Sequence, residues 1–129
     1  MRSLLVGVAM LASTPALATE WIYCDNADET VSLGVLAGSS DFLSVSAMTL
    51  QIKDERWSSD KVYGPGKPLT MLQGYSDVHQ IYVDLGDENA NEVIAELRVF
   101  LAQEGNEYVK GGVLRSPGRG AWTVTCEGP

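Results

Sequence analysis

Hydrophobic and polar residues alternate along much of the chain beyond residue 20, which is the pattern of β-strands with one buried face. The alternation is clearest over residues 30–36 and 78–85. The apolar positions of these two segments are Val31, Leu33, Val35, Ile81, Val83 and Leu85. Each segment is therefore predicted to be a strand that packs one side against a core.

Further short segments with the composition of strands are separated by turn residues, at 21–25, 43–53, 69–72, 108–115 and 121–126. Within residues 43–53 the apolar positions change parity, which predicts a β-bulge near Ser46-Ala47. Residues 54–68 are charged and rich in Gly and Pro, so they are predicted to form a long connection.

Residues 92–103 fit either a strand or a helix. A strand places Val93, Ala95, Leu97, Val99 and Leu101 on one face, whereas a helix clusters Val93, Ile94, Leu97, Phe100 and Leu101. Turn signals on the following residues favour the strand. The predicted fold is all-β, a small antiparallel sandwich or barrel of about 7–8 strands closed by one disulfide. The alternative is an α+β fold with one helix near 91–103.

The N-terminal residues have the three parts of a secretory signal peptide. Arg2 gives a positive start, Leu4 to Ala12 form a short apolar run, and Ala16-Leu17-Ala18 matches a cleavage site. We therefore expect a signal peptide over residues 1–18 and a single exported domain over 19–129, located in the periplasm or secreted. The chain has no second long apolar run, so no membrane insertion is expected.

The chain has two cysteines, Cys24 and Cys126, which lie near opposite ends of the predicted domain. Exported proteins meet an oxidising compartment, so the two are predicted to form one structural disulfide. A redox-active pair usually has close spacing such as C-x-x-C, which is absent here. The bond requires the first and last strands to be neighbours or to face each other.

The sequence is acidic, with a formal net charge of −8, which becomes −9 when Arg2 is removed with the signal peptide. Affinity for nucleic acid depends on clustered Lys and Arg, so this composition predicts no nucleic-acid binding. An acidic surface instead favours a cationic partner, and we expect a cationic envelope protein.

Catalytic and metal-binding patterns are weak. A single histidine, His79, rules out a multi-histidine metal site, and the sequence predicts neither a metal nor a cofactor. His79 has the same parity as Ile81 and Val83, which predicts a histidine at the edge of the core. The alternative function is a small periplasmic hydrolase that uses scattered carboxylates or a serine with His79.

Three aromatic residues, Trp57, Tyr63 and Tyr75, lie in or beside the predicted long connection. Aromatic side chains on loops are typical of binding surfaces, and these three are the predicted binding residues. The alternative is that these three side chains have a structural role and cover one end of the barrel. The favoured function is a non-catalytic binding or inhibitory module that acts through its loops, in preference to an enzyme.

Overall fold

The computed structural model describes residues 20–38 and 44–128; the predicted signal peptide lies outside these residues. The described part is all-β and contains one short 3-10 helix, η1 (Lys61–Tyr63). No helix within it is long and apolar enough to cross a membrane. The ten strands are β1 (Glu20–Asp25), β2 (Val31–Ala37), β3 (Val45–Ile52), β4 (Glu55–Ser58), β5 (Lys67–Pro68), β6 (Thr70–Ser76), β7 (Gln80–Gly86), β8 (Val93–Glu104), β9 (Glu107–Ser116) and β10 (Gly120–Glu127).

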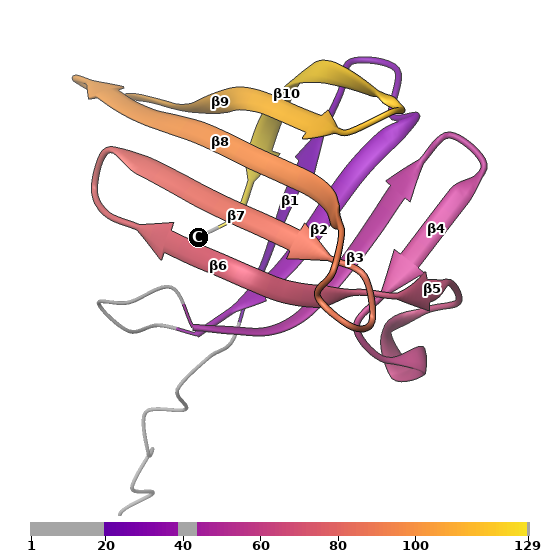
Figure 1. The fold of residues 1–129 in the computed structure, drawn as a ribbon. Helices are drawn as coiled ribbons and strands as arrows, with labels where there is room; N and C mark the ends of the chain where they lie inside the picture. The colour runs from indigo at the N-terminus through magenta and orange to yellow at the C-terminus, as the bar shows by residue number, and fades with distance from the viewer. Residues whose placement is uncertain (1–19, 39–43, 129) are drawn as a thin grey trace, which may run out of the picture.

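The strands form one strongly curved sheet in the order β5-β4-β3-β2-β1-β10-β9-β8-β7-β6, which curls into a nearly closed barrel (Figure 1). All neighbours are antiparallel except β4 and β5. The sheet thus consists of two meanders, β1 to β4, with the short strand β5 added parallel at its edge, and β6 to β10, that meet where β1 pairs with β10. The predicted all-β class is confirmed, with ten strands rather than seven or eight.

The core is built from alternate residues of the strands, as the sequence pattern predicts. Its largest fully buried side chains are Leu33, Leu50, Leu85, Leu97 and Leu114. Full burial of a leucine side chain stabilises the fold by about 1.5–3 kcal/mol. These five leucines come from five different strands, so the core links both meanders.

Residues 93–104 form β8, so the strand is confirmed and the helix alternative is wrong. Strand β8 pairs with β7 on one side and β9 on the other, which a helix could not do. A register shift opposite Leu85 and Gly86 makes Ile94 the extra residue of a bulge. Ile94 is consequently buried and Val93 is 39% exposed, so Val93 is not on the predicted inner face.

The bulge predicted near Ser46-Ala47 is confirmed. Leu36 pairs with Ala47 and Ala37 pairs with Val45, which leaves Ser46 without a partner across the ladder. An extra residue in one strand reverses the parity of everything beyond it. The two halves of β3 can therefore both direct their apolar side chains inward.

The predicted connection over residues 54–68 is wrong in part, because it contains β4 and β5. Lys53, with φ of 54°, turns the chain so that β4 pairs with β3. Strand β4 has four residues and one large apolar side chain, Trp57. Such a short segment cannot show a period-2 pattern, so the strand was not visible in the sequence.

The predicted disulfide between Cys24 and Cys126 is confirmed. The two residues are register partners on β1 and β10, with 4.0 Å between their Cα atoms, and both are buried. The bond therefore ties the two meanders together at the pair of strands where they meet. Its sequence separation of 102 residues encloses nearly the whole described domain.

Candidate protein-binding face

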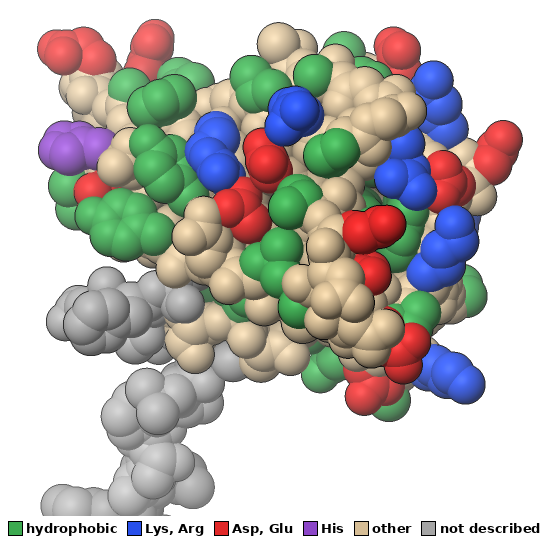
Figure 2. All heavy atoms as spheres, viewed as in Figure 1, with side chains coloured by type: hydrophobic (Ala, Val, Ile, Leu, Met, Phe, Trp, Pro, Cys, Tyr) green, Lys and Arg blue, Asp and Glu red, His purple; other side chains and the backbone are tan. Residues whose placement is uncertain are grey.

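Side chains on the outer face of β6 to β9 lie in rows, because register partners on adjacent strands point to the same side of a sheet. The two rows next to the β7–β8 turn each cross four strands: Gln73, Asp84, Glu96 and Arg115, and then Tyr75, Tyr82, Arg98 and Val113. The next row crosses three strands and contains Gln80, Phe100 and Gly111. The last two rows, toward the tip of the β8–β9 hairpin, are the pairs Ala102 and Val109, and Glu104 and Glu107. The rows change from charged to apolar and end in two acids. Figure 2 shows this face, with hydrophobic side chains gathered on the side of the hairpin.

The β8–β9 hairpin projects beyond the rest of the sheet (Figure 1). Pairing of β7 with β8 ends at Phe100, and pairing of β10 with β9 ends at Gly111. From there to the tip, β8 and β9 pair with each other. A two-stranded ribbon has no layer to cover it and is marginally stable alone. Its outward side chains Phe100 and Val109 are exposed and thus available to another molecule.

Four large apolar side chains on this face form what we call the apolar patch: Tyr75, Phe100, Val109 and Val113. They are 51%, 62%, 59% and 45% exposed, respectively. Gly111, the register partner of Phe100, has no side chain to cover the phenyl ring. Apolar residues scattered singly over a surface are ordinary, whereas several on one face make that face a candidate interaction site.

Acidic side chains border the apolar patch. Glu104 and Glu107 are register partners at the hairpin tip. Like charges directly opposite each other destabilise a hairpin, so stability does not explain this pair. On the other border, the backbone N–H of His79 donates a 2.7 Å hydrogen bond to Asp77 and lowers the pKa of that carboxyl. Asp77 is therefore ionised at neutral pH.

The Asp77 carboxylate also positions one residue of the patch. It accepts a 3.0 Å hydrogen bond from the Tyr75 hydroxyl, and this bond raises the pKa of Tyr75. The phenol remains neutral, and its ring is held 6.2 Å from that of Tyr82, its register partner. The tyrosine is thus fixed at one edge of the patch.

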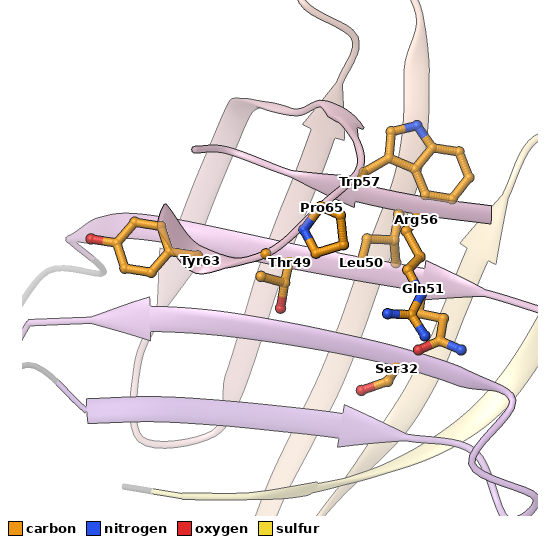
Figure 3. Close-up of a pocket in the computed structure, with 9 residues that line it drawn as sticks. Ser32, Thr49, Leu50, Gln51, Arg56, Trp57, Tyr63 and Pro65 are labelled. Carbon is orange, nitrogen blue, oxygen red and sulfur yellow. The ribbon is translucent and has the colours of Figure 1, made fainter. Parts of the chain in front are cut away.

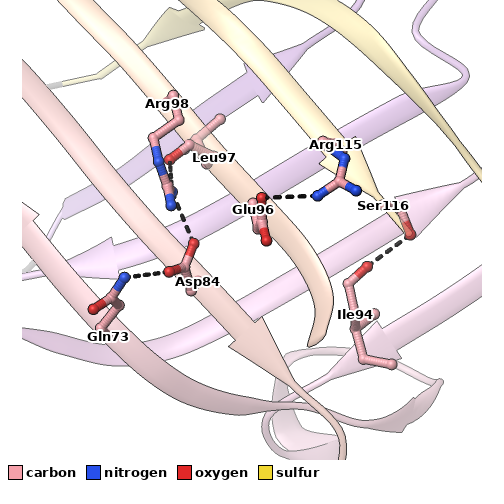
Figure 4. A network of polar contacts seen from close by, with 8 residues as sticks. All are labelled: Gln73, Asp84, Ile94, Glu96, Leu97, Arg98, Arg115 and Ser116. Carbon is pink, nitrogen blue, oxygen red and sulfur yellow. Dashed lines mark hydrogen bonds and ion pairs between the residues drawn. The ribbon is translucent and has the colours of Figure 1, made fainter. Parts of the chain in front are cut away.

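Charged side chains brace the sheet next to the patch (Figure 4). Arg98 donates a 2.8 Å hydrogen bond to Asp84, which raises the pKa of Arg98, and its guanidinium lies 5.0 Å from the Tyr82 ring centroid. Gln73 also donates to Asp84. Because these side chains come from β6, β7 and β8, they hold three strands together and keep the base of the patch rigid.

The three predicted binding residues do not form one surface. Tyr75 belongs to the apolar patch. Tyr63 is 41% exposed in η1 and makes an edge contact with Trp21 at 5.7 Å between ring centroids. Trp57 is 3% exposed and points into the barrel. Whether Trp57 and Tyr63 take part in binding remains a prediction.

Trp57 is covered by two cations. The Arg119 guanidinium lies 4.8 Å and the Lys67 ammonium 5.4 Å from its ring centroid. Both cations pair with Glu55, at 2.9 and 3.1 Å. Their hydrogen bonds, those of Arg119 foremost, lower the pKa of Glu55 to about 2. The carboxylate thus clamps β4 to the β9–β10 turn across one end of the barrel.

Sequence reasoning missed Phe100, Val109 and Val113. A weak signal was present, because a strand over 92–103 with Leu97, Val99 and Leu101 inside leaves Phe100 outside. A large apolar residue at an outward position is informative only when neighbouring strands leave it uncovered. That depends on where β7 and β10 end, which the sequence of β8 does not contain.

The prediction of a core-edge His79 is wrong, because His79 is exposed in the β6–β7 turn. Asp77 organises this turn by accepting hydrogen bonds from the backbone N–H groups of His79 and Gln80. In the described part of the chain no serine hydroxyl is bonded to the imidazole. No group of three or more His, Cys, Asp or Glu side chains among the described residues is placed to hold a metal.

Comparison of the chain with protein-family models, curated proteins and solved structures found no match. Function is therefore inferred from the molecule's own geometry and chemistry.

Proposed function

We propose that this protein is a non-catalytic binding module that docks a basic protein through the apolar patch and its acidic border. The observation that carries the proposal is the exposure of Phe100 and Val109 on a ribbon that projects from the barrel, with exposed Val113 beside its base on the same face. A partner that covered these side chains would remove apolar surface from water, which favours association.

The shape of the patch supports a protein partner over a small molecule. Small-molecule sites are concave and enclose most of the ligand. The patch instead lies on a strand surface, with the Phe100 and Tyr75 rings at its centre and edge and charged groups around it. An apolar centre with a polar rim is the usual anatomy of a protein interface, and aromatic residues commonly dominate its energy.

The charge of the molecule supports a basic partner. The formal net charge is −8, and Asp77, Glu104 and Glu107 border the patch. A negative field steers a cationic protein toward the face and makes the association rate depend on salt. The same field disfavours nucleic acid. Because a projecting ribbon can enter a cleft, an enzyme that bound it there would be inhibited.

The disulfide is compatible with an extracytoplasmic location, since such bonds persist in oxidising compartments. We propose the periplasm, or secretion, as the place where the module meets its partner. A basic envelope protein is then the partner class to test.

The test is affinity capture of a bacterial envelope extract on immobilised protein, with three variants. Phe100→Ser and Val109→Ser alter the patch. Val62→Ser is the matched control, because Val62 is 83% exposed in η1, away from the patch. Purified cytochrome c, a generic basic protein, measures binding by charge alone. We expect wild type and Val62→Ser to retain a basic protein that both patch variants lose.

The captured protein is then purified, and its affinity is measured at low and high salt. A loss of binding of about tenfold or more on Phe100→Ser, the scale of an interface anchor, supports the proposal. Capture that is equal for all variants, or no stronger than for cytochrome c, would overturn it. So would a dimer of this chain that the patch variants dissociate, seen by light scattering, because the occupant would then be a second copy.

A further inference from the structure

A hollow of about 190 Å³ lies on the other meander, between the outer face of β2 to β4 and the loop that contains η1 (Figure 3). Its floor includes Ser32, Gln51 and Arg56, which are successive register partners across three strands. Thr49 lies beside this row, and Pro65 faces the floor from the loop. The hollow is separate from the apolar patch, which is on β6 to β9.

The loop over the hollow is anchored at both ends. At its start, the backbone N–H of Met48 donates a 2.9 Å hydrogen bond to the Ser59 hydroxyl, and the Ser58 hydroxyl donates a 2.6 Å bond to the Asp60 carbonyl. At its end, Gly66 lies so close to β4 that a Cβ would be 2.7 Å from the backbone of Arg56. These contacts preform the hollow, so binding would not require the loop to be ordered.

Most polar side-chain groups of the hollow have no partner within the fold. Among the four arginines in the described residues, Arg98, Arg115 and Arg119 have ion pairs and Arg56 has none. In the same part of the chain, the hydroxyls of Ser32 and Thr49 have no hydrogen-bond partner. Gln51 uses one N–H to donate to the Lys53 carbonyl at 3.3 Å, which leaves its amide oxygen open.

We propose that this hollow is a second binding site, which takes a single hydroxylated ring that carries one carboxylate, a sugar acid of the uronate type. Arg56 offers the planar fork of N–H donors that pairs with a carboxylate through two hydrogen bonds. The hydroxyls of Ser32 and Thr49 and the Gln51 amide both donate and accept, as ring hydroxyls require. Pro65 supplies an apolar surface for the carbon face of the ring.

The size and charge of the surroundings restrict the ligand further. Sites for drug-sized ligands are commonly about 300–1,000 Å³, and this hollow is smaller, so one ring fits and a longer molecule would extend into solvent. The net charge of −8 repels a polyanion. A single carboxylate that is bound by close contact with Arg56 is compatible with both restrictions.

The experiment is a titration of the ¹⁵N-labelled protein, followed by amide chemical shifts, with four probes. Glucuronate carries the carboxylate and the hydroxyls, glucose lacks the carboxylate, benzoate lacks the hydroxyls, and inorganic phosphate lacks the ring. We expect glucuronate to shift the amides of the floor and of Gly64 and Gly66, and to bind about tenfold more tightly than glucose, because hydrogen bonds to charged groups are stronger.

Three variants test the assignment. Arg56→Gln should lower glucuronate affinity about tenfold to that of glucose. Thr49→Val should weaken glucuronate without affecting benzoate. Arg115→Gln, the matched control, removes the same charge from another face and should leave the titration unchanged.

Equal binding of glucose and glucuronate, phosphate binding as tight as glucuronate, or full affinity in Arg56→Gln would each overturn the proposal. So would the absence of any saturable shift. We expect no chemical-shift changes at Phe100 and Val109, which belong to the apolar patch. The titration therefore tests the hollow alone, and the capture experiment tests the patch alone.

Discussion

Replacement of Trp57 by alanine tests how the barrel end is held together. The indole is 3% exposed and lies beneath Arg119 and Lys67, which Glu55 holds over its face. Alanine would remove the ring and leave a cavity between β4 and the β9–β10 turn. The two cations would lose their contact with the ring but keep their ion pairs.

Truncation of a buried Trp to Ala typically costs about 3–5 kcal/mol of unfolding free energy, which includes the cavity. Loss of the two cation–π contacts adds about 0.5–1 kcal/mol each at exposed positions. Together these terms give about 4–7 kcal/mol. The site lies at the end of the barrel, where collapse of the cations into the space reduces the cost of the cavity, so we expect a total of about 3–5 kcal/mol. A domain of this size has about 5–15 kcal/mol in all.

Urea unfolding followed by far-ultraviolet circular dichroism measures the loss without relying on the Trp57 fluorescence. The matched control is Phe100→Ala, an aromatic residue that is 62% exposed, for which we expect a change within about 0.5 kcal/mol. If Trp57→Ala lowers the unfolding free energy by less than about 1 kcal/mol and also weakens capture of the partner, the reasoning from burial is refuted. Trp57 would then be a binding residue, as the sequence predicts.

Three further outcomes are expected from stability measurements. Cys24→Ser should lower the unfolding free energy by about 2–5 kcal/mol, because it opens a loop of 102 residues, and an unchanged urea midpoint on reduction of the wild type would contradict this. The pKa of Glu55 is lowered to about 2, so the advantage of wild type over Glu55→Gln should be full above pH 5 and vanish as the pH falls toward 2. An advantage that is the same at all pH values would argue against the clamp on Arg119. Gly66→Ala should lower the unfolding free energy by more than about 1 kcal/mol, and Gly64→Ala should lower it distinctly less. Both residues have positive φ, but an added Cβ would clash with the backbone only at Gly66. Equal melting temperatures of the two variants would contradict this contact.

The parts of the fold that were predictable are those in which a single strand contains its own evidence. Strand β7 alternates from Gln80 to Leu85, so its buried apolar residues, such as Val83, follow from period 2 alone. The change of parity in β3 similarly identifies the bulge at Ser46. The pairing of Cys24 with Cys126 follows because a chain with two cysteines allows only one intramolecular disulfide.

The features that could not be predicted from the sequence depend on contacts between distant segments of the chain. Trp57 lies on a strand of four residues, and its burial comes from Arg119, which is 62 positions further along the chain. The exposure of Phe100 depends on where β7 and β10 stop pairing. Local sequence patterns do not contain this information. Hydrophobicity indicates which side chains are more stable when buried, but not which of them are covered by other segments of the chain.

The order of the strands places the two proposed sites on different meanders. The hollow is built on β2 to β4 and the apolar patch on β6 to β9, and the two meanders are joined by the β1–β10 pairing, the disulfide and the Glu55–Arg119 clamp. The contacts that shape each site are local to its own meander: Ser58 with Asp60 for the hollow, and Asp84 with Arg98 for the patch. Each face can therefore hold its geometry through its own strands, while the disulfide and the clamp determine how the two faces are oriented relative to each other.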